Sequence, residues 1–155
     1  MTSDRHIIVI RTGSHDSRRN VLTAEGRVEM QRLAGMLAPL LRRRSVRLAC
    51  PAEQPENACT VFLASCLGIG TPYNQIELRR DELVTRQRVA LDLIKQISLE
   101  VDVVLLVIGE SQATQLATAI CKDLGGFTTE PLHSLRPAQA FAIQLDEIKG
   151  VKVLN

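Results

Sequence analysis

Three short polar segments of this chain carry residue types that handle anions. Arg11-Thr12-Gly13, Pro51 with the nearby Gln54, and Gly109-Glu110-Ser111 each follow an apolar run. A guanidinium group binds phosphate or carboxylate through paired hydrogen bonds, and a carboxylate placed beside it forms an ion pair instead. Brought together, these segments indicate either a site for an anionic ligand or an internal ion pair that fills such a site.

Two histidines are candidates for acid–base or nucleophilic chemistry. His15 stands beside Asp16, whose carboxylate could orient the imidazole as a catalytic base. His133 lies in a loop late in the chain and could approach the same region. A solvent-exposed side chain is the alternative for both, and we expect His15, which lies past Gly13, to point away from the strand-end pocket. His6 opens an apolar run and is expected to be structural.

The elements that must position these segments alternate between strand and helix. Apolar, β-branched runs predict strands over residues 6–10, 46–50, 101–108 and 140–145, with a weaker strand over 75–78 and either an edge strand or a tail over 151–154. Apolar residues at three- and four-residue spacings predict helices over residues 24–41, 83–97 and 111–124. Pro51 begins a loop or helix entry that leads into a further apolar helix, which ends at Leu67. The first helix begins after a Thr23 cap, and Pro39 is expected to kink or shorten its end. The order predicts a three-layer α/β/α sandwich with a mostly parallel mixed sheet, in which ligands bind beyond the carboxyl ends of the strands.

Composition limits the classes of protein. A chain of 155 residues is expected to form a single domain spanning residues 1–155. A formal net charge of +2, one Tyr, three Phe and no Trp argue against a general nucleic-acid binder. The amino-terminal residues show no hydrophobic signal core, and the longest apolar run, Val103 to Ile108, is too short to span a bilayer. We therefore expect a soluble cytoplasmic protein without a membrane partner.

The four cysteines show no pattern of a disulfide framework or a metal site. Cys50, Cys59, Cys66 and Cys121 form no C-x-x-C pair and have no histidine at metal-ligand spacing. Buried, reduced thiols are the simplest interpretation. We expect neither a metal nor a cofactor.

Four landmarks stand in chain order: Arg11-Thr12-Gly13, Leu22-Thr23-Ala24-Glu25-Gly26, Ala49-Cys50-Pro51 with Gln54, and the run from Val103 to Gly109-Glu110. Together they resemble the histidine phosphatase superfamily, which has the phosphoglycerate mutase-like fold, and most of all its small bacterial phosphohistidine phosphatase branch. Arg11-Thr12-Gly13 stands where that family has Arg-His-Gly, and Leu22-Thr23-Ala24-Glu25-Gly26 matches its Leu-Thr-x-x-Gly. Ala49-Cys50-Pro51 with Gln54 matches Ser-Ser-Pro followed by an arginine, and the run from Val103 to Gly109-Glu110 matches a strand ending in Gly-His. The resemblance covers nearly the whole chain.

The resemblance implies a phosphatase fold whose reacting groups are replaced. In the family the first histidine is the nucleophile, which two arginines and a second histidine assist. Here Thr12 and Glu110 occupy the two histidine positions and Gln54 occupies that of the second arginine, so only Arg11 remains. A carboxylate at position 110 would repel a phosphate dianion, and we predict that Arg11 and Glu110 form a salt bridge in the old phosphate site.

Three functions follow from these replacements. The first, which we favour, is a catalytically inactive phosphatase-fold protein that binds a protein partner or a small anionic ligand. The residues expected to bind the ligand are Arg11, Gly13, Gln54, Glu110 and Ser111. The second is an active phosphatase, with His15 or His133 as nucleophile and another cation in place of Gln54. The third is a structural subunit whose pocket is closed by its own side chains. The oligomeric state stays open.

Two basic clusters lie outside the four landmarks. Arg18 and Arg19 could form a cationic rim near Arg11, or simply a solvated loop. The densest cluster, Arg42-Arg43-Arg44 with Arg47, could attract an acidic partner or RNA, although basic residues at a helix end also complement the last carbonyl groups. We favour that second role.

Overall fold

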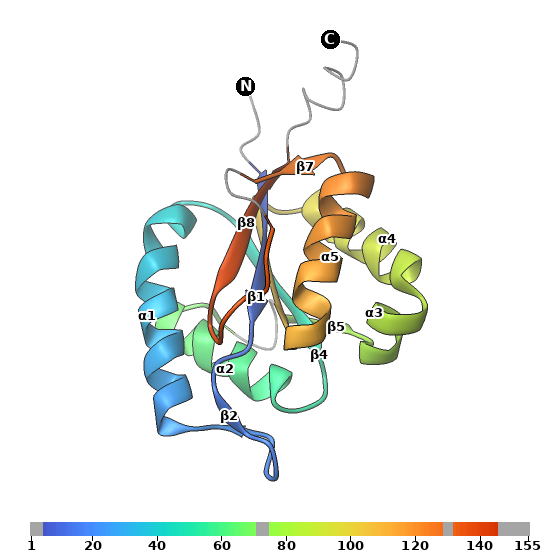
Figure 1. Cartoon of the computed structure of the whole chain (residues 1–155). Coiled ribbons are helices and arrows are strands. Elements are labelled where there is room, and N and C mark those ends of the chain that lie inside the picture. Colours follow the sequence, from blue (N-terminus) through green and yellow to red (C-terminus); the bar gives the residue numbers. More distant parts are fainter. Residues whose placement is uncertain (1–4, 71–74, 129–131, 146–155) are drawn as a thin grey trace.

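The computed structural model describes residues 5–70, 75–128 and 132–145 and has a six-stranded mixed sheet at its centre (Figure 1). The strand order is β5-β4-β6-β1-β8-β7. The strands are β1 (Arg5–Arg11), β4 (Val46–Pro51), β5 (Gln75–Leu78), β6 (Val103–Ile108), β7 (Gly126–Phe127) and β8 (Ala140–Leu145). β5, β4, β6 and β1 are parallel, whereas β8 is antiparallel to both β1 and β7. The predicted mostly parallel α/β sandwich is confirmed.

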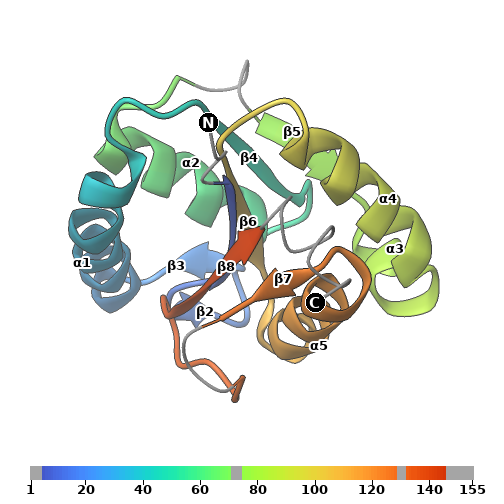
Figure 2. The same ribbon diagram turned by 90° about the horizontal axis from the view of Figure 1, so that it is seen from above.

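Helices cover both faces of this sheet, as the view along the strands shows (Figure 2). α1 (Ala24–Leu41) and α2 (Glu56–Leu67) lie on one face, and α3 (Arg80–Thr85), α4 (Gln87–Ser98) and α5 (Glu110–Asp123) lie on the other. Alternate residues of β1 therefore enter different cores: Ile8 and Ile10 pack with α1 and α2, and Ile7 and Val9 pack with α4 and α5. Burial on both faces explains why the central strands read as continuous apolar runs.

Parallel pairing brings three of the polar segments to one edge of the sheet. Arg11 pairs with Ile108 at the ends of β1 and β6, and β4 runs in the same direction. We call the side where these strands end the carboxyl edge, and the side where β4 and β6 begin the amino edge. The carboxyl edge lies at the bottom of Figure 1.

The first turn of α1 follows its predicted cap. The Thr23 hydroxyl accepts a hydrogen bond from Gly26 N at 3.0 Å and donates one to Ser14 O at 3.1 Å. Gly26 has no room for a side chain, because a Cβ there would lie 2.0 Å from Ser14 O. The cap thus joins α1 to the segment that follows β1.

The structure differs from the predicted elements in five places. No strand was predicted between residues 11 and 23, but β2 (His15–Asp16) and β3 (Val21–Leu22) pair as a small hairpin there. The helix expected over 83–97 is two helices, because the backbone leaves the helical region at Arg86. Pro39 lies inside α1, which continues to Leu41. The strand expected over 101–108 begins at Val103, and β7 was not predicted.

The cysteines are free thiols, but two of them are not buried. Cys50 and Cys59 lie in the core, whereas Cys66 is exposed and Cys121 is half-buried. The strand predicted over 151–154 lies outside the described residues. Within the described ranges, no helix is long and apolar enough to cross a membrane.

Candidate functional site

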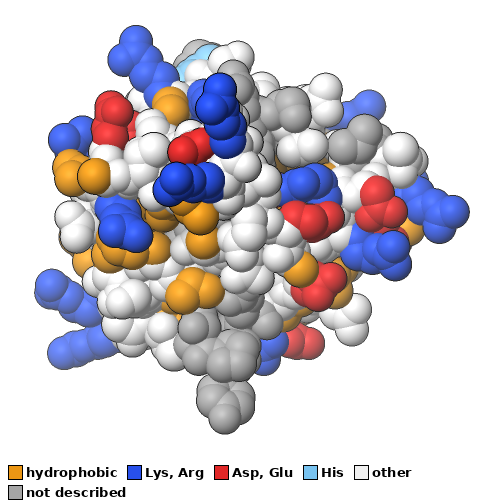
Figure 3. All heavy atoms as spheres, turned by 90° about the horizontal axis from the view of Figure 1, so that it is seen from below, with side chains coloured by type: hydrophobic (Ala, Val, Ile, Leu, Met, Phe, Trp, Pro, Cys, Tyr) orange, Lys and Arg blue, Asp and Glu red, His pale blue; other side chains and the backbone are white. Residues whose placement is uncertain are grey.

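An open cavity of about 540 Å³ lies at the carboxyl edge of the sheet. We call it the carboxyl-edge cavity. Its polar lining comes from the end of β1 and the segment after it, from β2 and from three helices; the lining side chains are Arg11, Thr12, Ser14, His15, Glu56 of α2, Arg80 of α3 and Gln112 of α5. Figure 3 views this side of the molecule, and acidic and basic side chains are mixed across it.

Arg11 and Thr12 enter the cavity from the end of β1. An Arg11 guanidinium nitrogen donates to Leu135 O at 2.5 Å, and the backbone N–H of Arg11 donates to Gln139 O at 2.9 Å. The carbonyl of Leu135 is uncharged, so this bond positions the guanidinium without neutralising it. Thr12 is 3% exposed and its N–H donates to Ile108 O at 3.1 Å, which ties the ends of β1 and β6 together.

Hydrogen bonds and close backbone packing hold the segment after Thr12 against α1. Glu29 accepts hydrogen bonds from Ser14 N at 2.7 Å and from Ser14 Oγ at 3.0 Å. A Cβ on Gly13 would lie 2.9 Å from Gly26 O, so both glycines are needed for this close backbone approach. The side of the cavity that Gly13 and Ser14 form is therefore held by packing.

Arg80 and Glu56 form an ion pair in the cavity through two hydrogen bonds. Arg80 Nε donates to Glu56 Oε2 at 2.9 Å, and Arg80 Nη2 donates to Glu56 Oε1. The Glu56 side chain is only 4% exposed, whereas that of Arg80 is 38% exposed. The hydrogen bond to Glu56 raises the pKa of the Arg80 guanidinium further above its usual value. The pair places a cation in the cavity together with the carboxylate that balances it.

No protein-family model matches this sequence, and no curated protein matches it. Solved structures do. The protein histidine phosphatase SixA, determined with tungstate, is 16% identical and has a TM-score of 0.72, covering 93% of this chain and 90% of that one. A SixA structure from Agrobacterium tumefaciens is 18% identical, with a TM-score of 0.57 over 77% of each chain. The mycobacterial glucosyl-3-phosphoglycerate phosphatase is 14% identical, with a TM-score of 0.54 over 88% and 89% of the two chains.

The chain has the histidine phosphatase fold. The resemblance inferred from the four sequence landmarks is confirmed at the level of the fold. Its carboxyl-edge cavity is lined by Arg11, Thr12 and Gly13, the segment that the sequence resemblance matched to Arg-His-Gly.

Gln54, at the family's second arginine position, turns its side chain away from the cavity. Its amide oxygen accepts a hydrogen bond from Ala58 N at 2.9 Å and so caps the start of α2. Its backbone carbonyl accepts from Arg80 Nη2 at 3.1 Å. A guanidinium group therefore lies beside position 54, but it belongs to Arg80 of α3. The sequence analysis missed Arg80 and Glu56. One sequence feature could have indicated Arg80: it follows the carboxyl end of the weak strand over 75–78, and ligands bind beyond the carboxyl ends of such strands.

Glu110 and Ser111 are the first two residues of α5, directly after Gly109, and their side chains lie outside the described part of the structure. Their backbone follows β6 at the same edge where Arg11 ends β1. The two strand ends are thus adjacent, as the predicted Arg11–Glu110 salt bridge requires. The pairing itself stays a prediction.

The structure separates the two candidate histidines. His15 lines the carboxyl-edge cavity from the β2–β3 hairpin, so the expectation that it points away from this pocket is wrong, and it is exposed to solvent, as the alternative had it. Its Nδ1 lies 3.3 Å from Gly13 O. His133 instead lines a different cavity of about 620 Å³ between α1 and β8, where it contacts the Phe141 ring edge-on.

Asp16 does not orient His15 through any contact in the described structure. Its carboxylate accepts hydrogen bonds from Arg18 N at 2.8 Å and Arg19 N at 3.4 Å, so it stabilises its own turn. Both arginine side chains are exposed and do not line the cavity. They lie in a solvated loop.

The remaining groups near the cavity are neither metal ligands nor activated nucleophiles. The described residues contain no cluster of three His, Cys, Asp or Glu that could hold a metal ion. Burial raises the pKa of the Cys59 thiol to about 12, and a hydrogen bond with the Gly13 backbone lowers it by less. A thiol with that pKa stays protonated at neutral pH and is a poor nucleophile.

Proposed function

We propose that this chain is a catalytically inactive protein of the histidine phosphatase fold that acts as a binding or regulatory module. Its ligand is an anionic group, on a small molecule or on a protein partner, which the carboxyl-edge cavity holds without transferring phosphate. One observation carries the proposal: the cavity combines the guanidinium groups of Arg11 and Arg80 with a buried Thr12 at the position of the family's nucleophile.

Thr12 is poorly suited to replace an imidazole. A threonine hydroxyl attacks phosphorus only when a base removes its proton, whereas an imidazole is nucleophilic at neutral pH. Among the described side chains, none that could act as a base forms a hydrogen bond with the Thr12 hydroxyl. Glu56, the nearest described carboxylate in the cavity, is held by two bonds from Arg80.

Binding an anion requires positive charge and hydrogen-bond donors in the same cavity, but no nucleophile. Arg11 supplies a guanidinium group at the end of β1, and one of its nitrogens is positioned by the bond to the Leu135 carbonyl. The amino end of α5 opens at the same place after Gly109, and the dipole of a 14-residue helix favours a negative group there. SixA was solved with tungstate, an oxyanion of phosphate shape, which supports the choice of ligand class.

His15 supports one alternative, an active phosphatase with a relocated nucleophile. That function needs a histidine in the cavity and a cation to replace the arginine missing at position 54. His15 lines the cavity and Arg80 stands beside Gln54. The absence of an orienting carboxylate among the described contacts of His15, and the pairing of Arg80 with Glu56, make this alternative the weaker one.

An activity assay separates the two functions. We would measure hydrolysis of a phosphohistidine protein and of a generic phosphomonoester at neutral pH by the natural chain, by His15→Ala, and by the triple variant Thr12→His/Gln54→Arg/Glu110→His. We expect no turnover by the natural chain and a gain in the triple variant. Turnover by the natural chain that His15→Ala abolishes would overturn the proposal. Circular dichroism verifies that each variant is folded.

A binding assay tests the positive half of the proposal. We would titrate tungstate by calorimetry into the natural chain, Arg11→Ala and Arg18→Ala. The two variants lose the same charge, but only Arg11 lines the cavity, so we expect Arg11→Ala to weaken binding about ten-fold and Arg18→Ala to leave it within about two-fold. Equal losses in the two variants, or no binding by the natural chain, would contradict an anion site at the carboxyl edge.

A further inference from the structure

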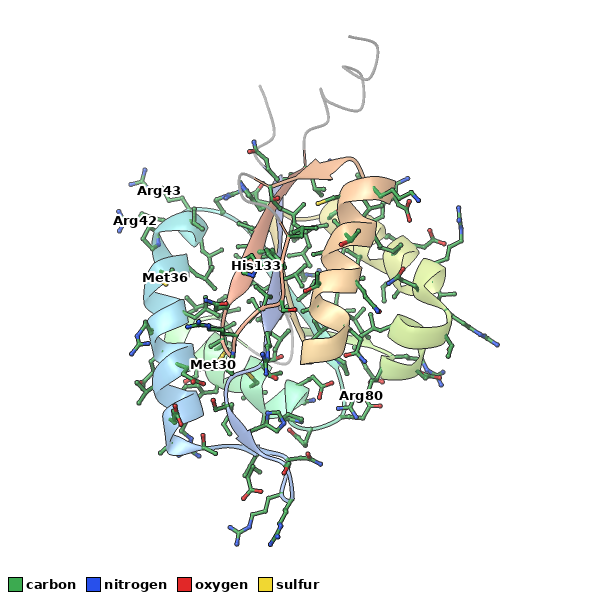
Figure 4. All side chains as sticks on the ribbon, viewed as in Figure 1. Met30, Met36, Arg42, Arg43, Arg80 and His133 are labelled. Atoms are coloured by element: carbon green, nitrogen blue, oxygen red, sulfur yellow. The ribbon has the colours of Figure 1, made fainter. Side chains whose placement is uncertain are left out.

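A second arginine-rich cavity, of about 590 Å³, lies at the amino edge of the sheet. We call it the amino-edge cavity. Arg42, Arg44 and Arg47 contribute to its lining, from the end of α1 and the start of β4. Figure 4 places Arg42 and Arg80 at opposite ends of the molecule, so this cavity is separate from the site described above.

Arg44 has a structural role that leaves its charge intact. Its guanidinium contacts three uncharged acceptors: Leu40 O at 3.1 Å, His6 Nδ1 at 3.0 Å and Asp102 O at 3.4 Å. The bond to Leu40 O satisfies a carbonyl of the last turn of α1, which is the structural role expected for this cluster. That role is therefore confirmed for Arg44, whose charge nevertheless remains on the wall of the cavity.

Arg42 and Arg47 have no such role. Within the described part of the chain, neither side chain makes a hydrogen bond or an ion pair. The carboxylate of Asp102, which lies beside the cluster, accepts from Ser45 N at 3.0 Å and from Ser45 Oγ at 3.2 Å instead. Two guanidinium groups therefore line a cavity without a partner that neutralises them.

The turn after α1 fixes which arginines face the cavity. Arg43 has a φ of 60°, in the left-handed region that a long side chain rarely adopts. This residue reverses the chain between Arg42 and Arg44, both of which line the cavity, while Arg43 itself does not. The sequence Arg42-Arg43-Arg44 thus contains two cavity residues and, between them, a natural control of the same charge.

Charge and shape together define the ligand. α1 and α2 both end at this cavity, and each helix end contributes roughly half a negative charge. Together with the Asp102 carboxylate beside the cluster, they offset only part of the charge of three guanidinium groups, so the cavity attracts an anion. The wall also includes the apolar side chains of Leu41, Leu67 and Val101. A cavity of a few hundred Å³ that combines cationic and apolar side chains fits a small organic anion.

We propose that the amino-edge cavity is a binding site for a small phosphate monoester that carries a short apolar group. The phosphate lies against Arg42 and Arg47, with Arg44 as a fixed third cation, and the apolar group lies against the wall formed by the two helix ends. A phosphate monoester is a dianion near pH 7 and accepts the paired hydrogen bonds that a guanidinium donates. This site does not depend on the proposed function of the carboxyl-edge cavity.

Hexyl phosphate and inorganic phosphate are the probes for this site. Each would be titrated by calorimetry into the full chain and into the double variant Arg42→Ala/Arg47→Ala. The matched control is Arg18→Ala/Arg43→Ala, which loses the same charge from exposed positions outside the cavity. Arg11→Ala tests separately whether the probe binds at the carboxyl edge.

We expect hexyl phosphate to bind more tightly than inorganic phosphate, because the apolar wall removes part of the alkyl chain from water. We expect Arg42→Ala/Arg47→Ala to weaken this binding at least about ten-fold, and the matched control and Arg11→Ala to change it less than about two-fold. Equal weakening in the two double variants would reveal general attraction to a basic surface and overturn the proposal. Loss in Arg11→Ala alone, no binding by the natural chain, equal affinity for the two probes, or stronger binding of a short RNA would also overturn it.

Discussion

The carboxyl-edge and amino-edge cavities both contain arginines, but only the first is known to contain a carboxylate that neutralises one of them. Arg80 is bound to Glu56 through two hydrogen bonds, whereas Arg42 and Arg47 have no partner in the described structure. An arginine paired with a buried carboxylate stabilises the fold, and removing it leaves a charge without a counterion. An unpaired arginine on a cavity wall contributes little to stability and is available to a ligand. Pairing, and not the number of arginines, therefore distinguishes the two cavities.

The largest expected effect tests this difference through stability. Arg80→Met removes the partner of Glu56, whose side chain is 4% exposed, and we expect it to lower the free energy of unfolding by about 3 kcal/mol. Arg42→Ala and Arg47→Ala should change it by less than about 0.5 kcal/mol, because neither side chain has a hydrogen bond or an ion pair to lose within the described structure. Urea denaturation of the natural chain and the three variants measures these values.

Arg79 is the matched control for Arg80. It neighbours Arg80 and forms an ion pair with Asp81 at 3.6 Å, but both side chains are about two-thirds exposed. Because solvent screens such pairs, Arg79→Ala should cost less than about 1 kcal/mol. Equal costs for the changes at positions 79 and 80 would mean that the Glu56 pair does not stabilise the fold and that the contrast between the cavities is wrong.

The second prediction concerns two glycines of α1. A Cβ at Gly26 would lie 2.0 Å from Ser14 O, whereas a Cβ at Gly35 would have nothing within 4 Å. We expect Gly26→Ala to destabilise the protein by about 1–3 kcal/mol, since α1 must move away from the segment after β1. Gly35→Ala should stabilise it by about 0.5–1 kcal/mol, because alanine is the better helix former. Thermal unfolding checks both signs.

Gly26→Ala also distinguishes the two cavities in ligand binding. The clash is with Ser14, which lines the carboxyl-edge cavity, and α1 reaches the amino-edge cavity only at its other end. Tungstate binding at the carboxyl edge should therefore weaken while hexyl phosphate binding at the amino edge persists. Loss of both would show that the change unfolds α1 as a whole.

The third prediction concerns Arg80 when Glu56 no longer carries a negative charge. Its expected effect, a change in tungstate affinity, is smaller. Glu56→Gln keeps the shape of the side chain but removes the negative charge that balances Arg80. We expect tungstate to bind about five-fold more tightly, which corresponds to about 1 kcal/mol, because a free cation is added to the carboxyl-edge cavity. Calorimetry measures the change, and unchanged hexyl phosphate affinity is the internal control. Unchanged or weaker tungstate binding would mean that Arg80 does not face the bound anion.

The fold could be predicted from the sequence because its strongest patterns are local. The apolar run Val103–Ile108 is buried on both sides and forms β6, and the Thr23 cap begins α1 where predicted. What the sequence analysis missed depends on distant neighbours. The β2–β3 hairpin pairs only two residues on each strand, too few to produce an alternating pattern. The break at Arg86 lies between two segments of similar helical pattern.

The site was predicted in part. Arg11, Thr12 and Gly13 were identified because they follow a clear strand, and they line the cavity. Arg80 was missed because the strand before it has only four residues, and Glu56 was missed because a glutamate in the first turn of a helix is ordinary. Gln54 was expected to bind the ligand, but its side chain caps α2, a choice that one sequence does not reveal.

The prediction with the smallest expected effect compares the cysteine thiols near the two ends of α2. Cys59 is buried beside Gly13 at the carboxyl edge, and Cys66, two turns later, is exposed next to Leu67 of the amino-edge cavity. Burial raises the pKa of the Cys59 thiol from 9.0 to about 12, so the folded state holds this proton more tightly than the unfolded state does. Below pH 9 the Cys59 thiol makes its full contribution to the free energy of unfolding, and this contribution falls as the pH rises from 9 toward 12.

Between pH 8 and pH 9.5 the natural chain should therefore lose about 1 kcal/mol of unfolding free energy that Cys59→Ala does not lose. Denaturation at the two pH values measures that difference in slope, which is independent of the cost of the cavity that alanine leaves. Cys66→Ala is the control and should keep the slope of the natural chain, because it removes an exposed thiol and leaves Cys59 in place. If Cys59→Ala kept that slope as well, the thiol would be solvated in the folded protein, and the packing of α2 beneath Gly13 would be looser at the carboxyl edge than the structure has it.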